Sequence, residues 1–349
     1  MLVAVTGGTG FIGSHSVRAL IAAGHRVRLL VRDPAKMKRI YAPLGIELDD
    51  VVVGDATDPA SVDALLRGCD GLLHAAALVA LEAARADEVR ANNERSVRLV
   101  VGGAVERDLE RIVYVSSAGA LFVPNGPVLT GDSPVAAARA TRADPSANAY
   151  GESKASGERT VRELQAAGAP ILTTFPTAAV GPDDPGLTDP NRAVSFFVRY
   201  GAVLTSTGYQ PIDVRDLAAL HVALLESDRR QGRYIAAGPY QPWPSLYAAV
   251  ERVTGRRLPR YHVPGSLMRG VGRLVDAVRS RFPFETPIPI TREAMEFATC
   301  WPTADGEPAQ RDLGLRYRDL EDTLADTYRW MLAAGHVRAR DVGDLAASR

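Results

Sequence analysis

The sequence predicts an α/β protein in which helices cover both faces of a doubly wound parallel sheet, with a smaller C-terminal lobe interleaved with it. Two observations support this fold class. Short apolar runs of strand length alternate with helical segments over residues 1–240, which is typical of parallel sheets buried on both faces. A glycine-rich turn joins the first strand to the first helix. The length of 349 residues suggests about two domains.

The turn at residues 6–15 reads T-G-G-T-G-F-I-G-S-H and follows a short apolar strand. Apolar residues then recur at helical spacing until Gly24 ends the helix. Glycines let the backbone approach a ligand closely, and a helix N-terminus presents unpaired N–H groups to a phosphate. We therefore predict a Rossmann-type dinucleotide site at the G-x-x-G-x-x-G spacing formed by Gly7, Gly10 and Gly13.

The rest of the first half continues the alternation of strands and helices. Pro34 turns the chain out of the second strand, and Pro59 stands in the first turn of a helix, where proline is tolerated. Gly168 ends the helix that precedes the sixth strand. We expect strands at 26–31, 51–53, 71–74, 111–115 and 171–175, and helices at 35–40, 59–67, 85–107 and 149–167.

The second half mixes loops, short strands and helices, so we expect two lobes that share the chain. Segments 118–148 and 181–191 are predicted loops, because they are rich in proline, glycine and small residues. A strand is expected at 234–236 and helices at 216–225, 245–254, 266–281 and 320–332. The predicted cofactor domain comprises 1–176 and 209–237, the substrate lobe 177–208 and 238–335, and a flexible tail 336–349.

The amino-acid composition limits which binding partners and metal sites are expected. Lys plus Arg and Asp plus Glu both number 41, so no net charge attracts nucleic acid or an anionic membrane. Cys69 and Cys300 are too few for a disulfide framework, and the six histidines show no metal spacing. No apolar run is long enough to span a bilayer, and no signal peptide is visible. We expect a cytoplasmic protein without a metal site.

A second motif indicates acid–base chemistry. Tyr150 and Lys154 stand four residues apart on a predicted helix and therefore share one face. A neighbouring ammonium lowers the pKa of a tyrosine hydroxyl, which lets it exchange protons near neutral pH. Ser117 follows the fifth strand, where its hydroxyl can donate to a substrate oxygen. No base is placed to activate a serine nucleophile, which argues against a hydrolase.

Together, the glycine turn and these three residues resemble the extended short-chain dehydrogenase/reductase superfamily. The resemblance covers residues 1–240, and within it the runs at 31–34 and 68–75 are similar to dihydroflavonol-reductase-like and cinnamoyl-CoA-reductase-like enzymes. It implies that Ser117, Tyr150 and Lys154 are catalytic. Phe175 stands where many sugar-modifying members have arginine, which argues against a nucleotide-sugar epimerase. Arg95 replaces the family's usual glycine.

The resemblance also implies a set of cofactor-binding residues. Asp55 matches the residue that receives the adenine amino group, and D-V-x-D at 213–216 leads into the returning helix. The residues expected to bind the cofactor are Gly7, Thr9, Gly10, Phe11, Ile12, Gly13, Arg32, Lys36, Asp55, Ala56, Ala75, Ala76, Ala77, Asn92, Tyr150, Lys154, Pro176 and Val180.

The choice between NADP(H) and NAD(H) depends on the end of the second strand. An acidic residue there would bind the ribose diol of NAD, whereas Arg32 can clamp a 2′-phosphate in two hydrogen bonds. Lys36 adds positive charge nearby. The alternative is a solvated basic turn in which Asp33 reaches the ribose. We expect NADP(H), with NAD(H) as the other candidate.

The sequence thus predicts an NADP(H)-dependent oxidoreductase that reduces a carbonyl of a small, fairly apolar substrate, or oxidises the alcohol. Two alternatives stay open: a redox-neutral epimerase or dehydratase, and a non-catalytic dinucleotide sensor. The helix at 266–281 has an apolar stripe and a basic face, and can serve as a lid, a homodimer surface or a membrane contact. Phe196, Phe197 and Trp243 indicate either an aromatic substrate pocket or core packing, as do Phe282 and Phe284.

Overall fold

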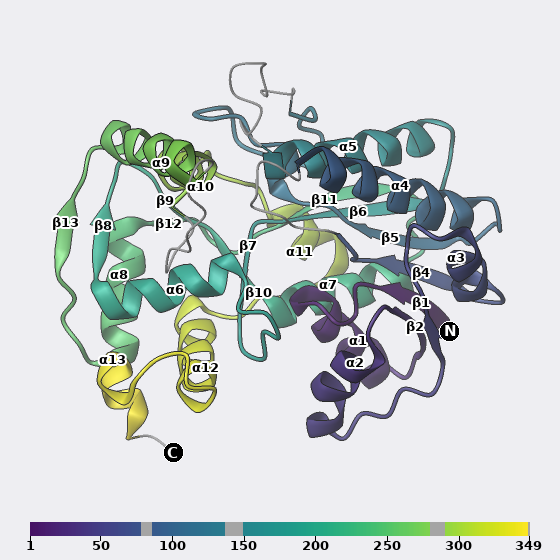
Figure 1. Ribbon diagram of the computed structural model, residues 1–349, viewed down its shortest axis with the longest axis horizontal. Coiled ribbons are helices and arrows are strands. Elements are labelled where there is room, and N and C mark those ends of the chain that lie inside the picture. The colour runs from purple at the N-terminus through teal and green to yellow at the C-terminus, as the bar shows by residue number, and fades with distance from the viewer. Residues whose placement is uncertain (78–85, 137–148, 280–289, 348–349) are drawn as a thin grey trace.

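The computed structural model describes residues 1–77, 86–136, 149–279 and 290–347, and confirms the predicted fold class. Its centre is a seven-stranded sheet in the order β11-β6-β5-β4-β1-β2-β3, and all neighbouring strands are parallel (Figure 1). The chain reverses its winding direction between β1 and β4, which is where open α/β sheets bind ligands. The strands are β1 (Leu2–Thr6), β2 (Arg26–Val31), β3 (Val51–Val53), β4 (Gly71–His74), β5 (Arg111–Val115), β6 (Ile171–Pro176) and β11 (Gly232–Ala236).

Successive residues of the strands face opposite layers of helices. Val3 and Val5 belong to one apolar core and Ala4 between them to another, and each core is shared with a different layer of helices. Both faces are therefore buried, which explains why the strands are apolar without alternation. One layer contains α1 (Phe11–Ala22), α2 (Pro34–Tyr41), α7 (Val214–Glu226) and α11 (Glu307–Leu313), and the other α3 (Pro59–Leu66), α4 (Ala86–Val105) and α5 (Ala149–Ala166).

A smaller lobe has its own core, built around large aromatic side chains. Phe197, Trp243, Tyr247 and Tyr328 are buried there. Its helices are α6 (Asp189–Tyr200), α8 (Trp243–Thr254), α9 (Gly265–Arg279), α10 (Arg292–Cys300), α12 (Leu320–Ala333) and α13 (Ala339–Val342), and its strands are β8 (Ala202–Leu204), β9 (Gly208–Tyr209), β12 (Gln241–Pro242) and β13 (Arg260–His262). The strand pair β7 (Ala178–Val180) and β10 (Pro211–Asp213) lies between the lobes (Figure 1).

Within the predicted tail, the described residues 336–347 include side chains that pack in the core of the smaller lobe. Val337, Val342 and Leu345 are at most 8% exposed and join the core of the smaller lobe. The Arg256 guanidinium donates to the Asp341 carbonyl and ties the segment to the end of α8. The burial of a few apolar side chains is thus enough to pack a segment in which most residues are polar.

Several elements of the second half were not predicted. The helix α6 begins inside the expected loop at 181–191, and α10 and α11 arise where no helix was expected. Helices α10 and α11 have only nine and seven residues, which is too few for a clear helical period. Helix α6 has proline in its first turn, directly after a loop-like segment. Among the described helices, none is long and apolar enough to cross a membrane.

Candidate functional site

The glycine turn lies between the ends of β1 and β4, and its glycines are required by close backbone contacts. Gly7 has φ +76°, and a Cβ there would lie 2.6 Å from both the Ala75 carbonyl carbon and the Ala76 nitrogen. A Cβ on Gly13 would lie 2.2 Å from the Gly7 carbonyl oxygen. A side chain at either position would push the turn away from β4 or from α1.

The turn leaves the N-terminus of α1 available to an anion. Gly10 occupies the N-cap position without a capping side chain, and the first turn of the helix carries no acidic residue. The buried Tyr41 hydroxyl donates to the Gly8 carbonyl at 2.6 Å and holds the loop against α2. Unpaired N–H groups beside glycine backbone are the arrangement that binds a pyrophosphate, so these residues fit a dinucleotide. The role of Tyr41 has no signal in the sequence.

The ends of β2 and β3 bring the predicted adenosine-end residues together. Arg32 is exposed, and its guanidinium has no hydrogen bond or ion pair to any residue that the structure describes. Asp33 caps α2 by accepting from the backbone nitrogens of Ala35 at 2.8 Å and Lys36 at 3.0 Å. Partial burial raises the pKa of Asp55, but hydrogen bonds from Thr57 and the nearby Arg32 outweigh it and lower the pKa. Asp55 is thus an ionised acceptor beside the Arg32 guanidinium.

The end of β4 contributes a buried histidine and small residues. The His74 imidazole is fully buried, lies 2.7 Å from the Thr6 hydroxyl, and stacks on Tyr114. Burial, together with the Lys154 ammonium, lowers the pKa of His74 to about 3, so the ring is neutral. Ala75–Ala77 follow directly, and the Ala76 nitrogen donates to the Thr6 hydroxyl at 3.3 Å.

The predicted catalytic residues come from β5 and α5. Ser117 follows β5, and its Oγ accepts from the Gly119 nitrogen at 3.1 Å. Lys154 is partly buried, and desolvation lowers its pKa to about 8. The Lys154 ammonium also lowers the pKa of His74, the last residue of β4. Tyr150 stands one turn earlier in α5, and its side chain lies outside the described part of the chain.

Two contacts steady the start of α5 and were not expected from the sequence. The Asn93 amide donates to the Ser153 hydroxyl at 2.6 Å, whereas the predicted neighbour Asn92 is half-buried on α4. The Gly151 nitrogen donates to the Glu293 carboxylate of α10 at 3.0 Å. Glu293 is 142 residues away in the chain, so no local pattern could have revealed this contact.

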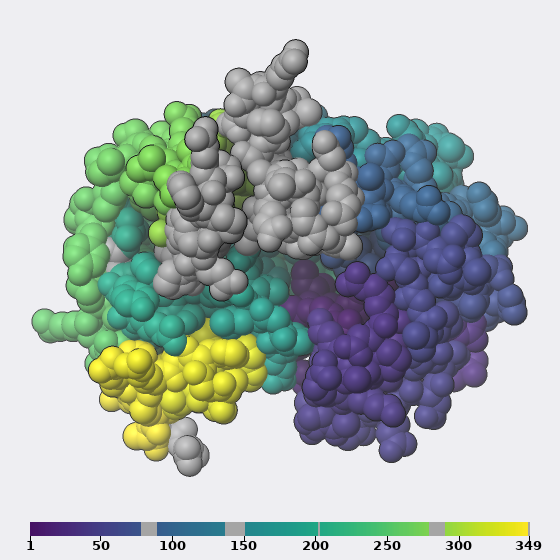
Figure 2. All heavy atoms as spheres, in the orientation of Figure 1, coloured from purple at the N-terminus to yellow at the C-terminus, as the bar shows by residue number. Residues whose placement is uncertain are grey.

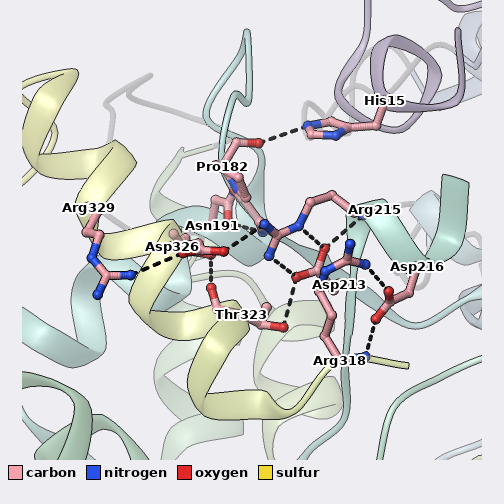
Figure 3. A network of polar contacts seen from close by, with 12 residues as sticks. His15, Pro182, Asn191, Asp213, Arg215, Asp216, Arg318, Thr323, Asp326 and Arg329 are labelled. Carbon is pink, nitrogen blue, oxygen red and sulfur yellow. Dashed lines mark hydrogen bonds and ion pairs between the residues drawn. The ribbon is translucent and has the colours of Figure 1, made fainter. Parts of the chain in front are cut away.

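A polar network joins the lobes around the D-V-x-D segment (Figure 3). The buried Asp213 carboxylate accepts from Arg215 at 2.7 Å and from the Thr323 hydroxyl at 2.9 Å. Arg215 also donates to Asp326 at 2.7 Å, and Arg318 forms an ion pair with Asp216. The motif therefore fixes α12 of the smaller lobe against the start of α7.

The loop after β7 is attached directly to the glycine-turn helix. The His15 Nε2 lies 2.9 Å from the Pro182 carbonyl oxygen (Figure 3), and Arg18 forms an ion pair with Asp183 at 2.8 Å. Val180, one of the predicted cofactor-binding residues, is fully buried in the core of the smaller lobe. Pro176 ends β6 beside Ala236 of β11.

The aromatic residues considered for a substrate pocket divide into two groups. Phe197 and Trp243 pack edge to face, with ring centres 5.7 Å apart, inside the core of the smaller lobe. Phe196 is half-buried beside Tyr200, and Phe282 and Phe284 lie outside the described residues. A different aromatic cluster lies close after Ser117 in the chain. Phe122 contacts Phe297 of α10 and Trp301, the residue after α10, with 4.5 and 5.5 Å between ring centres.

Three buried histidines make the fold sensitive to acid. Burial lowers the pKa of His15 to about 4 and that of His74 and His221 to about 3. In the unfolded chain a histidine titrates near 6.5, so below that pH the unfolded state binds more protons. The free energy of unfolding should therefore fall as the pH drops from 6.5 to 4, by up to about 1.4 kcal/mol per pH unit for each histidine. Urea titrations across this range measure the slope.

His221→Gln tests the contribution of one ring. The His221 nitrogens lie 2.8 Å from the Ser16 hydroxyl and 3.2 Å from the Thr174 hydroxyl, so the variant loses stability at pH 7. Its unfolding free energy should nevertheless depend less steeply on pH. The exposed His262→Gln is the control and should keep the wild-type slope. Equal slopes in all three proteins would contradict the prediction.

Comparison with known proteins places the chain among reductases and epimerases. A model of the NAD dependent epimerase/dehydratase family matches residues 3–238. A putative dihydroflavonol 4-reductase from Synechocystis sp. is 28% identical over 350 residues, with 96% of each chain covered. Sterol demethylase protein B from Methylococcus capsulatus is 27% identical, covering 97% of this chain and 100% of that protein. The crystal structure of gox2253 superimposes with a TM-score of 0.76 at 26% identity, covering 97% and 99%.

Proposed function

Because the chain belongs to the NAD-dependent epimerase/dehydratase family, we propose that it is an NADP(H)-dependent oxidoreductase acting on a small, fairly apolar carbonyl compound or the corresponding alcohol. Family membership confirms the resemblance noted in the sequence. The observation that carries the proposal is Lys154. Its ammonium, with a pKa of about 8, stands one turn after Tyr150 at the sheet edge where the glycine turn and Ser117 also lie.

The residues at this edge of the sheet have different roles in the proposed proton transfer. Ser117 donates a hydrogen bond to the substrate oxygen and orients it. Tyr150 supplies the proton that this oxygen takes up on reduction, and Lys154 stabilises the phenolate that remains. Burial of Lys154 strengthens its effect, because charges interact more strongly where water is excluded. A bound nicotinamide would supply or accept the hydride.

The preference for NADP(H) is supported by Arg32 and Asp33. Arg32 extends from the end of β2 with no described residue paired to its guanidinium. Asp33, the residue that would otherwise reach the ribose diol, uses one carboxylate oxygen to cap α2. An arginine at this position can bind a 2′-phosphate in two parallel hydrogen bonds. Lys36 lies in the first turn of the same helix.

The apolar character of the substrate is supported by the Phe122 cluster and by the relatives. Phe297 and Trp301 are only partly buried, and they lie beside the segment that carries Ser117. Two of the similar proteins carry names that refer to a flavonol and a sterol, which are both polycyclic. We therefore propose a polycyclic or aromatic ketone, or an aldehyde of similar polarity.

Turnover with NADPH tests the proposal against its two alternatives. We expect the amount of NADPH consumed to equal the amount of ketone or aldehyde reduced, for a compound from a panel of aromatic, steroid and aliphatic carbonyls. Conversion of a substrate without net loss of NADPH would instead indicate a redox-neutral epimerase or dehydratase. Binding of NADPH, followed by thermal shift, with no turnover across the panel would indicate a sensor.

A further inference from the structure

One segment connects two strands' ends at the carboxyl edge of the central sheet, the edge at which doubly wound sheets bind dinucleotides. Residues 177–182 begin where β6 ends and finish against α1, the helix that follows β1. In the sheet, β5 and β4 lie between β6 and β1. Within the segment, β7 pairs with β10. The segment therefore borders the edge along which a dinucleotide on the glycine turn would extend.

Two contacts hold the end of this segment on α1, and we call them the α1 clamp. The buried His15 Nε2 lies 2.9 Å from the Pro182 carbonyl oxygen (Figure 3), and because a carbonyl oxygen only accepts, Nε2 donates the hydrogen bond. Arg18 forms an ion pair with Asp183 at 2.8 Å. His15 and Arg18 stand three residues apart and therefore share one face of the helix. The same helix presents its N-terminus to a pyrophosphate.

The loop beyond the α1 clamp is held together by its own hydrogen bonds. The buried Asp184 carboxylate accepts from the Thr188 backbone nitrogen at 2.6 Å and from the Asn191 amide at 3.0 Å. The Asn191 amide also donates to the Gly181 carbonyl at 3.0 Å and accepts from the Gly181 nitrogen at 3.3 Å. Residues 181–191 thus form one hydrogen-bonded unit that continues into α6 of the smaller lobe. The clamp attaches this unit to the cofactor-binding helix.

We propose that His15 and Arg18 are positioning residues for the cofactor, because they fix residues 177–188 at the sheet edge and thereby slow dissociation of a bound dinucleotide. A segment that is fixed before binding loses little conformational freedom when the ligand binds. Without the clamp, part of the binding free energy would be spent on ordering the segment, and the dinucleotide would leave faster. The proposal rests on dinucleotide binding and not on the substrate or on the direction of the reaction.

Asp183→Asn separates the clamp from simple electrostatic attraction. The variant removes a negative charge beside α1, so charge alone would make an anionic dinucleotide bind more tightly. Loss of the clamp has the opposite effect: dissociation should be about two- to fivefold faster, as expected for a half-exposed ion pair. Asparagine suits this position because Asp183 has φ +57°, in the left-handed region that asparagine tolerates. His15→Leu removes the buried hydrogen bond and should speed dissociation about three- to tenfold.

Stopped-flow fluorescence of the reduced nicotinamide measures these rates without any turnover. NADPH bound to the full-length protein is displaced with excess NADP⁺, and NADH with excess NAD⁺. Asp50→Asn is the matched control, because Asp50 also pairs with an arginine, Arg28, at 2.7 Å and is 43% exposed, compared with 41% for Asp183. It directly precedes β3 and so lies at the opposite edge of the parallel sheet. Asp50→Asn should keep the wild-type dissociation rate.

Hydrogen exchange gives a second measure of the same device. Without cofactor, the backbone amides of residues 181–188 should exchange faster in Asp183→Asn and His15→Leu than in the wild type, and thermal unfolding shows that each variant is folded. Unchanged dissociation in both folded variants, unchanged exchange, or tighter binding by Asp183→Asn would overturn the proposal. So would a folded wild type that binds neither NADPH nor NADH. A failure to reduce any carbonyl would overturn the proposed function and leave these binding results as they are.

Discussion

Tyr150→Phe should lower kcat by about 10²- to 10⁴-fold, the range for removing a general acid–base group. The phenyl ring keeps the shape of the side chain but cannot supply a proton. The dissociation constant for NADPH should change little, because the glycine turn, Asp55 and Arg32 are all elsewhere. Steady-state kinetics and cofactor binding by fluorescence titration measure the two effects separately.

Tyr261→Phe is the matched control for this variant. Its ring is 53% exposed beside α9, away from the catalytic helix, so the loss of its hydroxyl should leave kcat unchanged. Turnover of Tyr150→Phe within about threefold of wild type would contradict the acid–base role of Tyr150. A loss of NADPH affinity as large as the loss of kcat would indicate instead that Tyr150 holds the cofactor.

Arg32→Ser should raise the KM for NADPH by about ten- to a hundredfold and leave the KM for NADH nearly unchanged. Hydrogen bonds to charged groups contribute about 1.5–3 kcal/mol, and only NADPH carries the phosphate that would accept them. Initial rates measured with NADPH and with NADH, at a fixed carbonyl concentration, give the change in KM for each cofactor.

Arg39→Ser provides a comparison in the neighbouring helix. Its guanidinium is 68% exposed and lies 3.6 Å from the Asp33 carboxylate, so its removal takes away one charge beside Asp33 and leaves Arg32 in place. We expect less than about a threefold change in either KM. An equal effect of Arg32→Ser on both cofactors would exclude recognition of the 2′-phosphate at this residue.

The elements of the larger domain could be predicted because local chemistry determines them. Every strand of the central sheet corresponds to an apolar run, and proline or glycine marks most helix boundaries. The smaller lobe was harder to predict. Its helix α10 makes a distant contact, from Glu293 to Gly151, that leaves no periodic pattern. The burial of Val337, Val342 and Leu345 likewise depends on packing against remote segments.

The sequence by itself determined the chemistry: a glycine turn before a helix, Tyr150 and Lys154 one turn apart, and arginine at residue 32. These features depend on residue types at short spacings, which a chain carries before it folds. The tertiary structure decided how the surroundings of these residues change their pKa values, contacts and exposure. Burial lowers the pKa of Lys154 to about 8, and one carboxylate oxygen of Asp33 caps α2. Leu267 and Leu274 of α9 are 58% and 64% exposed. Burial and exposure arise only when segments remote in sequence pack together, so no local pattern records them.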